Sequence, residues 1–595
     1  MKPIHYSIVP KNPAAHIFEV TLTVAEPDPA GQVFSLPVWI PGSYMVREFA
    51  RNIVTLSAHG ETARRVAIDK TDKQTWRAAP CKGALTLVYE VYAWDLSVRT
   101  AHLDDNVGFF NGTSVFLSVA GQEAAPCQVE LRKPEGAVYK DWRVATALTE
   151  ARGTRRYAFG QYRAANYDEL IDHPVTLGHF ALGQFRAHGA SHDVVISGRV
   201  PKLDMERLTR DLKPICEAQI ALFEPKSKRA PFERYVFMTM AVTDGYGGLE
   251  HRASTALICN RADLPVLGQA TASEGYRTYL GLCSHEYFHT WNVKRIKPAS
   301  FAPYDLTREN YSELLWLFEG FTSYYDDLIL VRSGLIDTPE YFRLLGKTVG
   351  GVSRGAGRFK QSVAQSSFDA WIKYYRQDEN APNAIVSYYT KGSLVALAFD
   401  LTIRAQTRNR KSLDDVMRLL WQRYGRDFYQ GKGRGIREDE VEALLAEATG
   451  ADLGKLFAQA VHGTRDLPLA DLLAPFGVTI SPDAGGSTPG LGARIRGGAE
   501  CTLASVHDHS AAQKAGLSAG DVLIALDGLR VTGSNLDSLL SRYRAGDRVE
   551  IHAFHRDELR SFTVKLDPAD VTRYVLSRDD ARGSAKKWGD AWLQG

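Results

Sequence analysis

Two histidines four residues apart are the feature of this sequence that points most directly to chemistry. His285 and His289 flank Glu286 in the motif His-Glu-Tyr-Phe-His, inside a segment that can be helical throughout. Residues i and i+4 share one face of a helix, so both imidazoles can bind one cation while Glu286 activates the attacking water. The alternative is that the two histidines line a core or an exposed face and bind nothing.

Glu319 is the candidate third ligand. It lies in the apolar run Leu314-Leu-Trp-Leu-Phe-Glu-Gly-Phe, where an unpaired carboxylate is costly to bury and a divalent cation removes that cost. Two histidines and one carboxylate leave a fourth tetrahedral position open, as in catalytic zinc sites, so we expect one zinc ion per chain. Manganese and cobalt suit the same ligands. Asp326, two helical turns after Glu319, is a candidate acceptor for the distal nitrogen of a ligand histidine, with surface ion pairing as the alternative.

A glycine-rich segment upstream, Asp244-Gly-Tyr-Gly-Gly-Leu-Glu-His, carries a second possible site. Gly247 and Gly248 would let a substrate backbone approach a strand edge, and Glu250 offers a negative charge for a free ammonium group. From composition alone, a loop with a solvated glutamate is the favoured interpretation. Lys294 and Arg295 are explained equally well by substrate binding and by a basic helix end, so the sequence assigns them no role.

The elements that must position these residues predict a multidomain α+β protein. A chain of 595 residues is several times the size of one hydrophobic core. Short alternating runs predict an N-terminal all-β domain over 1–198, and helical spacing predicts a mainly α domain over 199–480. Its expected helices are 272–292, 309–333, 391–406, 413–425 and 438–449. A Gly/Ser/Pro-rich linker from Ser481 opens a third domain over 481–570, followed by a C-terminal tail over 571–595.

Composition excludes several classes of partner. The net charge is only +3, from 72 basic and 69 acidic residues, so we expect neither nucleic acid nor an anionic membrane. The sequence has no long apolar run and no N-terminal signal-peptide pattern, which predicts a cytoplasmic protein, with a removed presequence left open. The six cysteines are scattered, which favours buried free thiols over disulfides or a cysteine zinc cluster.

Two segments carry a resemblance to a known family. His-Glu-Tyr-Phe-His-Thr-Trp-Asn-Val-Lys-Arg-Ile-Lys-Pro at 285–298 and Trp-Leu-Phe-Glu-Gly-Phe-Thr at 316–322 resemble the PDZ-containing glycyl aminopeptidases, relatives of the aminopeptidase N family. The resemblance covers nearly the whole chain. It implies a thermolysin-like catalytic domain and a zinc aminopeptidase that hydrolyses peptides from a free N-terminus, with a preference for glycine or alanine. The 30 positions between His289 and Glu319 fit this branch better than aminopeptidase N, where the gap is shorter, and require an insertion between helices.

The resemblance also implies roles for single residues. Gly247-Gly-Leu-Glu-His matches the exopeptidase motif of these aminopeptidases, although its last residue replaces an asparagine, and implies that Glu250 binds the substrate N-terminus. Ser387-Tyr-Tyr-Thr-Lys-Gly resembles a Tyr-x-Lys-Gly segment whose tyrosine stabilises the oxyanion. Matching on Lys391-Gly392 selects Tyr389, and Tyr388 remains the alternative.

The C-terminal part resembles a PDZ domain. Ala515-Gly-Leu, Gly520-Asp-Val-Leu-Ile and Asp527-Gly are the specific features, and they imply a peptide ligand bound by strand addition. The loop Gly490-Leu-Gly-Ala departs from the usual apolar last residue. Two other functions remain open: a zinc endopeptidase in which Glu250 is structural, and a PDZ-based peptide-binding protein with a vestigial metal site. The sequence leaves the oligomeric state open.

Overall fold

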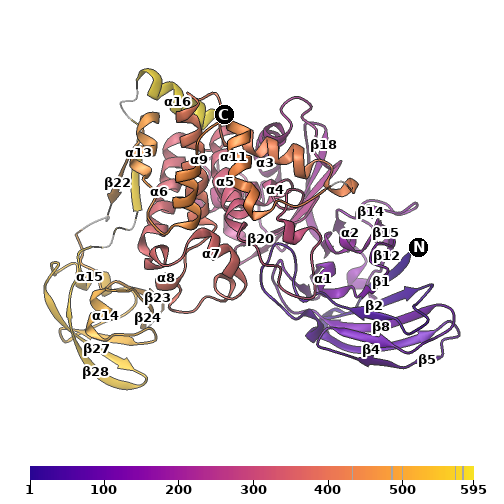
Figure 1. The fold of residues 1–595 in the computed structure, drawn as a ribbon. Helices are drawn as coiled ribbons and strands as arrows, with labels where there is room; N and C mark the ends of the chain where they lie inside the picture. Colours follow the sequence, from indigo (N-terminus) through magenta and orange to yellow (C-terminus); the bar gives the residue numbers. More distant parts are fainter. Residues whose placement is uncertain (432, 484–486, 499, 570, 572, 579–581) are drawn as a thin grey trace. The chain divides into compact units, whose positions relative to one another are not determined.

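The computed structural model describes residues 1–595 apart from 432, 484–486, 499, 570, 572 and 579–581. The chain forms two compact units, Met1–Asn310 with Leu420–Ile436, and Tyr311–Leu419 with Arg437–Gly595. Along the chain, strands come first, helices dominate the middle, and strands return near the C-terminus (Figure 1). The predicted multidomain α+β class is confirmed.

The first unit begins with an eight-stranded sheet in the order β14-β15-β12-β1-β2-β8-β4-β5. Side chains in its long strands are buried at alternate positions, as the sequence pattern predicts. The strands are β1 (Ile4–Asn12), β2 (Ile17–Val24), β4 (Ile53–Gly60), β5 (Arg65–Val66), β8 (Leu85–Tyr92), β12 (Cys127–Leu131), β14 (Thr149–Glu150) and β15 (Gly160–Ala164).

Two four-stranded sheets, β13-β16-β10-β9 and β11-β3-β7-β6, complete the all-β part. Their strands are β3 (Val33–Ser35), β6 (Ile68–Lys70), β7 (Thr75–Ala78), β9 (Ala101–Leu103), β10 (Val107–Phe110), β11 (Ser118–Val119), β13 (Arg143–Thr146) and β16 (Val175–Gly178). Two short helices, α1 (Gly112–Val115) and α2 (Tyr167–Ile171), connect them.

A five-stranded sheet, β17-β18-β19-β21-β20, carries the next part of the first unit. Its strands are β17 (Phe180–Ala187), β18 (Ala190–Ser197), β19 (Arg234–Val242), β20 (Gly247–Glu250) and β21 (Ser254–Asn260). The alternating pattern predicted that the β domain ends at residue 198. This sheet crosses that boundary, because β18, which ends at Ser197, pairs with β19. The segment Gly247–Glu250, which composition favoured as a loop, is an edge strand antiparallel to β21.

Two helices pack with this sheet. α3 (Met205–Phe223) contacts β17, and α4 (Glu274–Phe288) contacts α3, β20 and β21. Ser273 begins α4 as its N-cap by accepting a hydrogen bond from the backbone N–H of Tyr276. The predicted helix 272–292 is confirmed over Glu274–Phe288; it ends four residues earlier than predicted, with His289 as its C-cap.

The second unit is mainly helical. Its longer helices are α5 (Phe321–Arg332), α6 (Thr338–Arg354), α7 (Val363–Phe368), α9 (Thr390–Gln406), α10 (Leu413–Leu420) and α11 (Val441–Thr449); the shorter ones are α8 (Ala381–Ala384), α12 (Gly454–Phe457) and α13 (Leu469–Leu473). The predicted start of a helix at 309 is wrong, because residues 309–314 are turn and coil and a π-helical turn, Trp316–Gly320, precedes α5. The sequence did not indicate α6, because two of its buried positions, Gly346 and Gly350, are glycines and weaken the apolar period, although Asp337 caps the helix.

The C-terminal domain is a six-stranded sheet with the order β23-β24-β25-β27-β28 and β26 paired to β25. Its elements are β23 (Ala493–Arg496), β24 (Cys501–Val506), α14 (Ala511–Ala515), β25 (Val522–Leu526), β26 (Leu529–Arg530), α15 (Leu536–Leu540), β27 (Arg548–His555) and β28 (Glu558–Lys565). Part of the predicted linker lies outside the described residues. Backbone hydrogen bonds between Gly490 and Asp567, of 3.2 and 3.1 Å, bring the two ends of the domain together.

The segment predicted as a tail forms regular structure. β29 (Arg573–Ser577) pairs with β22 (Thr479–Asp483), and α16 (Gly583–Gln594) follows. Trp592 is completely buried, and its indole N–H donates to the Tyr324 hydroxyl of α5 at 2.9 Å. The expected tail is thus part of the helical core.

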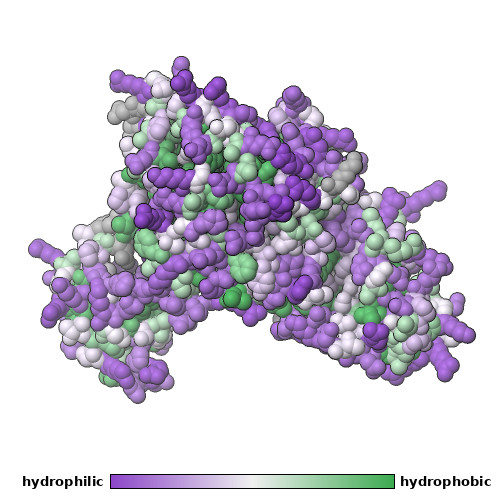
Figure 2. All heavy atoms as spheres, in the orientation of Figure 1, coloured by the Kyte–Doolittle hydropathy of each residue, from purple (hydrophilic) through white to green (hydrophobic). Residues whose placement is uncertain are grey.

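Hydrophilic side chains cover most of the face drawn in Figure 2, with apolar ones scattered between them. Among the described residues, no helix has both the length and the apolar character that a membrane crossing needs. The six cysteines are free thiols and five of them are buried, as predicted.

Candidate metal centre

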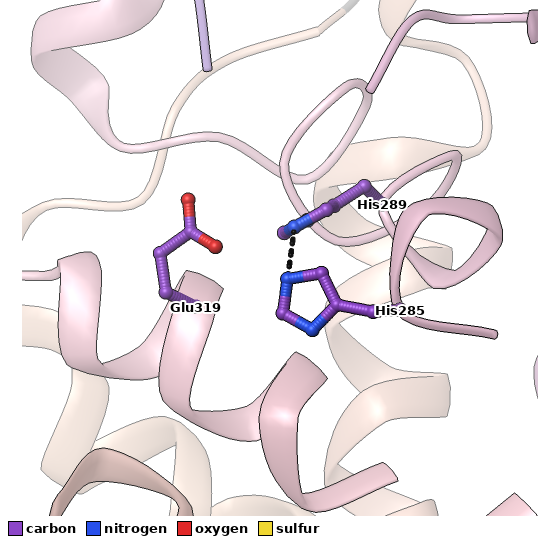
Figure 3. Close-up of side chains that lie close together, drawn as sticks. All are labelled: His285, His289 and Glu319. Atoms are coloured by element: carbon purple, nitrogen blue, oxygen red, sulfur yellow. Dashed lines mark hydrogen bonds between the residues drawn. The ribbon is translucent and has the colours of Figure 1, made fainter. Parts of the chain in front are cut away.

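The three predicted metal ligands come together. One ligand atom from each of His285, His289 and Glu319 lies within 4.8 Å of the other two (Figure 3). The Nε2 atoms of the two histidines are 3.1 Å apart, close to the separation of about 3.4 Å that tetrahedral zinc with bonds of about 2.1 Å requires. The residues therefore fit the predicted ion.

A backbone carbonyl fixes the orientation of the second histidine. Nδ1 of His289 lies 2.7 Å from the carbonyl oxygen of Asn292, which can only accept, so Nδ1 carries the proton and Nε2 keeps its lone pair for a metal. Asp326, the predicted acceptor, does not have this role for His289. Its Oδ1 accepts a hydrogen bond from the backbone N–H of Asp327 at 2.6 Å.

Glu319 lies in the π-helical turn before α5 and is 1% exposed. π-helical turns occur frequently at functional sites, because the wider turn redirects a side chain. The next residue, Gly320, touches α9: a Cβ on Gly320 would lie 2.6 Å from Cα of Gly392, and one on Gly392 would lie 2.9 Å from Cα of Gly320. Glycine is therefore required at both positions, which lets the start of α9 pack against the turn that carries Glu319.

Glu286, the predicted base, is 5% exposed and lies directly beside strand β20. A Cβ at Gly248 would lie 2.0 Å from its Oε1 atom, whereas a Cβ at Gly247 would meet nothing closer than 3.8 Å. Gly248 is therefore the glycine that the carboxylate requires. The sequence predicted that Gly248 lets a substrate backbone approach the strand. Its contact with Glu286 is a second reason for glycine at this position.

Glu250 ends the same strand and is 4% exposed. Its carboxylate packs against Gly42 of the all-β part, where a Cβ would lie 2.5 Å from Oε2. Gly42 has a φ of +97°, which favours glycine independently. Sequence reasoning missed Gly42, whose only local signal is the turn dipeptide Pro41-Gly42.

A buried carboxylate, Asp172, connects the residues that follow β20 to those that follow α4, the helix that carries the two histidines. Asp172 accepts from Arg252 Nε at 2.8 Å and lies 3.1 Å from His251 Nδ1, just after Glu250. It also pairs with Lys294 Nζ at 2.7 Å, just after the metal helix. Burial alone would raise the pKa of Asp172, but Lys294 and Arg252 hold it well below its usual range.

The two basic residues after the metal helix thus have structural contacts. Lys294 is 2% exposed and pairs with Asp172, and Arg295 donates to the carbonyl oxygens of Arg252, Thr290 and Pro231. His251 likewise faces Asp172. These contacts favour positioning over substrate binding for all three.

The two candidate tyrosines differ in exposure. Tyr388 is completely buried, and burial, with Tyr375 and Glu319 nearby, raises the pKa of its phenol well above the usual value. Tyr389 is partly exposed at the start of α9, and its hydroxyl lies 3.4 Å from that of Tyr375. Tyr389 is therefore the one that can meet a substrate without rearrangement.

Two histidines and a glutamate that meet at one point, with Glu286 next to the first histidine, are the ligand set of a catalytic zinc site. Three family models match the chain: the Peptidase M61 N-terminal domain at residues 5–179, M61 glycyl aminopeptidase at 278–395, and a PDZ domain at 477–566. The protein is a metallo-aminopeptidase. It belongs to the M61 glycyl aminopeptidase family, as the resemblance in the sequence predicted.

Solved structures include a relative of nearly identical extent. The chain is similar to an aminopeptidase N family protein from Idiomarina loihiensis, with 41% identity and a TM-score of 0.93 over 99% of this chain and 100% of that chain. An M1 zinc metallopeptidase from Deinococcus radiodurans matches at 15% identity and a TM-score of 0.47, over 79% of this chain and 95% of that one. No curated protein sequence matches the chain.

Proposed function

We propose that the protein binds one zinc ion through His285, His289 and Glu319 and removes residues from the free N-terminus of peptides, preferring glycine or alanine. The observation that carries this proposal is the order of contacts along β20. Gly248 lies against the base Glu286, and Glu250 follows two positions later on the same face of the strand.

The spacing of these contacts suits an exopeptidase. Two residues of a strand span about 7 Å. One amino-acid residue, from its ammonium nitrogen to its carbonyl carbon, spans about 2.5 Å, and a hydrogen bond of about 2.8 Å at each end brings the total to a similar length. A substrate whose ammonium group binds Glu250 therefore presents its first peptide bond near Glu286.

Each side chain has a chemical role in this proposal. Zinc bound at the three ligands would polarise the scissile carbonyl. Glu286 takes a proton from the attacking water and passes it to the leaving amine. Tyr389 donates a hydrogen bond to the oxyanion, and Glu250 pairs with the substrate ammonium.

The preference for small residues is supported by the crowding around Glu250. The carboxylate is 4% exposed, and Gly42 packs so closely that even one added carbon would collide with it. A first substrate residue that reaches this carboxylate has little room for a large side chain.

Hydrolysis of matched peptides with free and acetylated N-termini tests the proposal. Acetylation removes the charge and the donors that Glu250 binds, so we expect free glycyl and alanyl peptides to be cleaved and blocked ones to resist. Glu250→Ala should remove this distinction at a cost of about 2–5 kcal/mol for free substrates. Rapid internal cleavage of acetylated peptides by the intact enzyme would establish an endopeptidase instead.

A further inference from the structure

Arg99 lies beside the glycine strand β20, on the side away from the proposed base. A Cβ atom at Gly247 would lie 3.8 Å from one terminal nitrogen of the Arg99 guanidinium and 3.9 Å from the other. A Cβ atom at the next residue, Gly248, would instead meet the carboxylate of Glu286. Since successive residues of a strand face opposite sides of a sheet, β20 has a carboxylate on one side and a guanidinium on the other.

The guanidinium of Arg99 is available to a ligand. The side chain is half-buried, and its Nε atom is buried without a hydrogen-bond partner among the described residues. The backbone N–H of Arg99 donates to the hydroxyl oxygen of Ser97 at 3.2 Å, but no described carboxylate pairs with its guanidinium. A guanidinium presents five N–H donors in a planar fork that matches a carboxylate, and buried donors without acceptors are costly. The position therefore favours a carboxylate ligand.

The backbone on both sides of Arg99 is held in place. The carbonyl oxygens of Val98 and Thr100 accept hydrogen bonds from the side-chain amide of Asn111, at 2.9 and 3.2 Å, and Asn111 is completely buried. Val98 and Ile258 line the same small cavity, and Ile258 belongs to β21, the partner of β20. The guanidinium is thus positioned beside β20 before any ligand arrives, which lowers the entropic cost of binding.

A peptide bound along β20 would direct its second side chain to the Arg99 side. β20 is the last strand of its sheet, so an extended peptide can add to its edge. With its ammonium group at Glu250 and its first peptide bond beside Gly248, this peptide runs antiparallel to β20. The Cα atom of its second residue lies about 2.4 Å beyond the cleaved carbonyl carbon. Strand residues are about 3.4 Å apart, so this Cα lies nearer to Gly247 than to Gly248.

Residues that lie opposite each other in paired strands direct their side chains to the same face of the sheet. The second side chain of the peptide therefore shares a face with the Cβ position of Gly247, which is the face of Arg99. The backbone of an added strand stays in the plane of the sheet, whereas its side chains stand above and below that plane. A carboxylate on the side chain, rather than one at the end of the backbone, is directed at Arg99.

We propose that Arg99 binds the carboxylate side chain of the second substrate residue, so that the enzyme favours peptides in which aspartate or glutamate follows the N-terminal glycine or alanine. This inference rests on the proposed aminopeptidase function and adds the class of residue that follows the cleaved bond. The two substrate residues are then selected on different sides of β20, the first beside Glu250 and the second beside Arg99.

The test compares kcat/KM for glycyl-glutamyl-alanine amide and glycyl-glutaminyl-alanine amide with the full-length zinc enzyme. The two side chains have the same shape but only one is charged, and the amide removes the terminal carboxylate. We expect the glutamyl peptide to be preferred by about tenfold or more, as one charge-assisted contact provides. Arg99→Gln should bring this ratio close to one. Arg99→Lys, which keeps the charge and loses the fork, should keep part of it. Arg77→Ala removes an exposed arginine of β7 and, as the matched control, should retain the ratio.

Two further pairs of substrates locate the contact. The third side chain of the peptide faces away from Arg99, so glycyl-alanyl-glutamic acid amide and its glutamine counterpart should be cleaved at similar rates. A preference for glutamate that is larger at the third position than at the second overturns the inference. Glycylalanine and glycylalanine amide differ only in the terminal carboxylate, so a preference for the acid that depends on Arg99, without a preference for a glutamyl side chain, also overturns it.

The remaining outcomes separate this inference from the function beneath it. A ratio near one in the wild type, or a ratio that Arg99→Gln leaves unchanged, overturns the carboxylate contact. Because each ratio compares two substrates of one preparation, a variant that folds only in part still gives a valid ratio. Glycyl p-nitroanilide has no second residue, so its hydrolysis by the wild type, and the resistance of its acetylated form, report on the aminopeptidase function independently.

Discussion

Gly248 and Glu286 are complementary: the carboxylate of Glu286, the proposed base, occupies the space where any other residue at 248 would place its Cβ atom. Gly248→Ala should therefore displace the base, and a displacement of about 1 Å costs on the order of 10²-fold in kcat. Zinc content, measured by atomic absorption, should stay at that of the wild type. Gly247→Ala is the matched control, since a Cβ there meets nothing closer than 3.8 Å; equal losses in the two variants would contradict the steric explanation.

Glu286→Gln keeps the shape of the side chain and removes its ability to accept a proton. We expect kcat to fall by about 10²-fold or more, as for the loss of a general base, with about one zinc ion retained per chain. Chelation should abolish hydrolysis in the wild type, and added zinc should restore it. Near-normal turnover in Glu286→Gln would show that another group activates the water.

Tyr389→Phe and Tyr388→Phe form a matched pair, since each variant removes a single hydroxyl group and the two positions are adjacent. Tyr389→Phe should cost about 3 kcal/mol of transition-state stabilisation, seen mainly in kcat, because an oxyanion donor acts after substrate has bound. Tyr388→Phe should change kcat much less. The reverse result would assign the donor to the buried tyrosine.

Gly42→Ala probes the neighbour of Glu250 from a different part of the chain. An added Cβ would push against the carboxylate, so we expect kcat/KM for free glycyl substrates to fall by about tenfold or more. Gly121→Ala is the control for backbone strain, because Gly121 also has a positive φ, of +80°, but has no atom within 4 Å of its Cβ position. A similar loss in both variants would mean that strain, and not the carboxylate contact, is responsible.

Excision of the PDZ domain should leave a folded peptidase. Its ends are hydrogen-bonded to each other through Gly490 and Asp567, so a short glycine-serine linker can replace residues 491–566. We expect a melting temperature within about 5 °C of the wild type and continued hydrolysis of glycyl p-nitroanilide. Truncation after residue 566 is the contrasting variant, because it keeps the PDZ domain and removes Trp592 from the helical core, at about 3–5 kcal/mol. An unfolded excision variant would show that the two parts do not fold independently.

The sequence predicted the parts of the site that depend on local spacing. His285, Glu286 and His289 lie within one helical turn or so, and Glu319 lies in a run so apolar that a carboxylate needed a partner. The glycines of β20 were harder to interpret, because glycine indicates turns more often than strands and only the pairing with β21 makes an edge strand of them.

Contacts between distant segments left no local signal. Gly42 meets Glu250 across about two hundred residues of chain, and Asp172 joins residues on two other elements. α16 is different: Trp588 and Trp592 are spaced as one face of a helix, but the small and charged residues around them gave the segment the composition of a tail.

Because α16 is buried, the helical part of the protein cannot complete its packing until α16 has been synthesised. Trp592 fills the helical core beside Tyr324, yet the whole PDZ domain is translated between the two. At about 5–20 residues per second, the ribosome needs roughly 6–24 s to pass from residue 476 to residue 594. During that time the helices that present Glu319 and Tyr389 lack their last packing partner. The helical part of the nascent chain is thus incompletely packed until after the PDZ domain has been made.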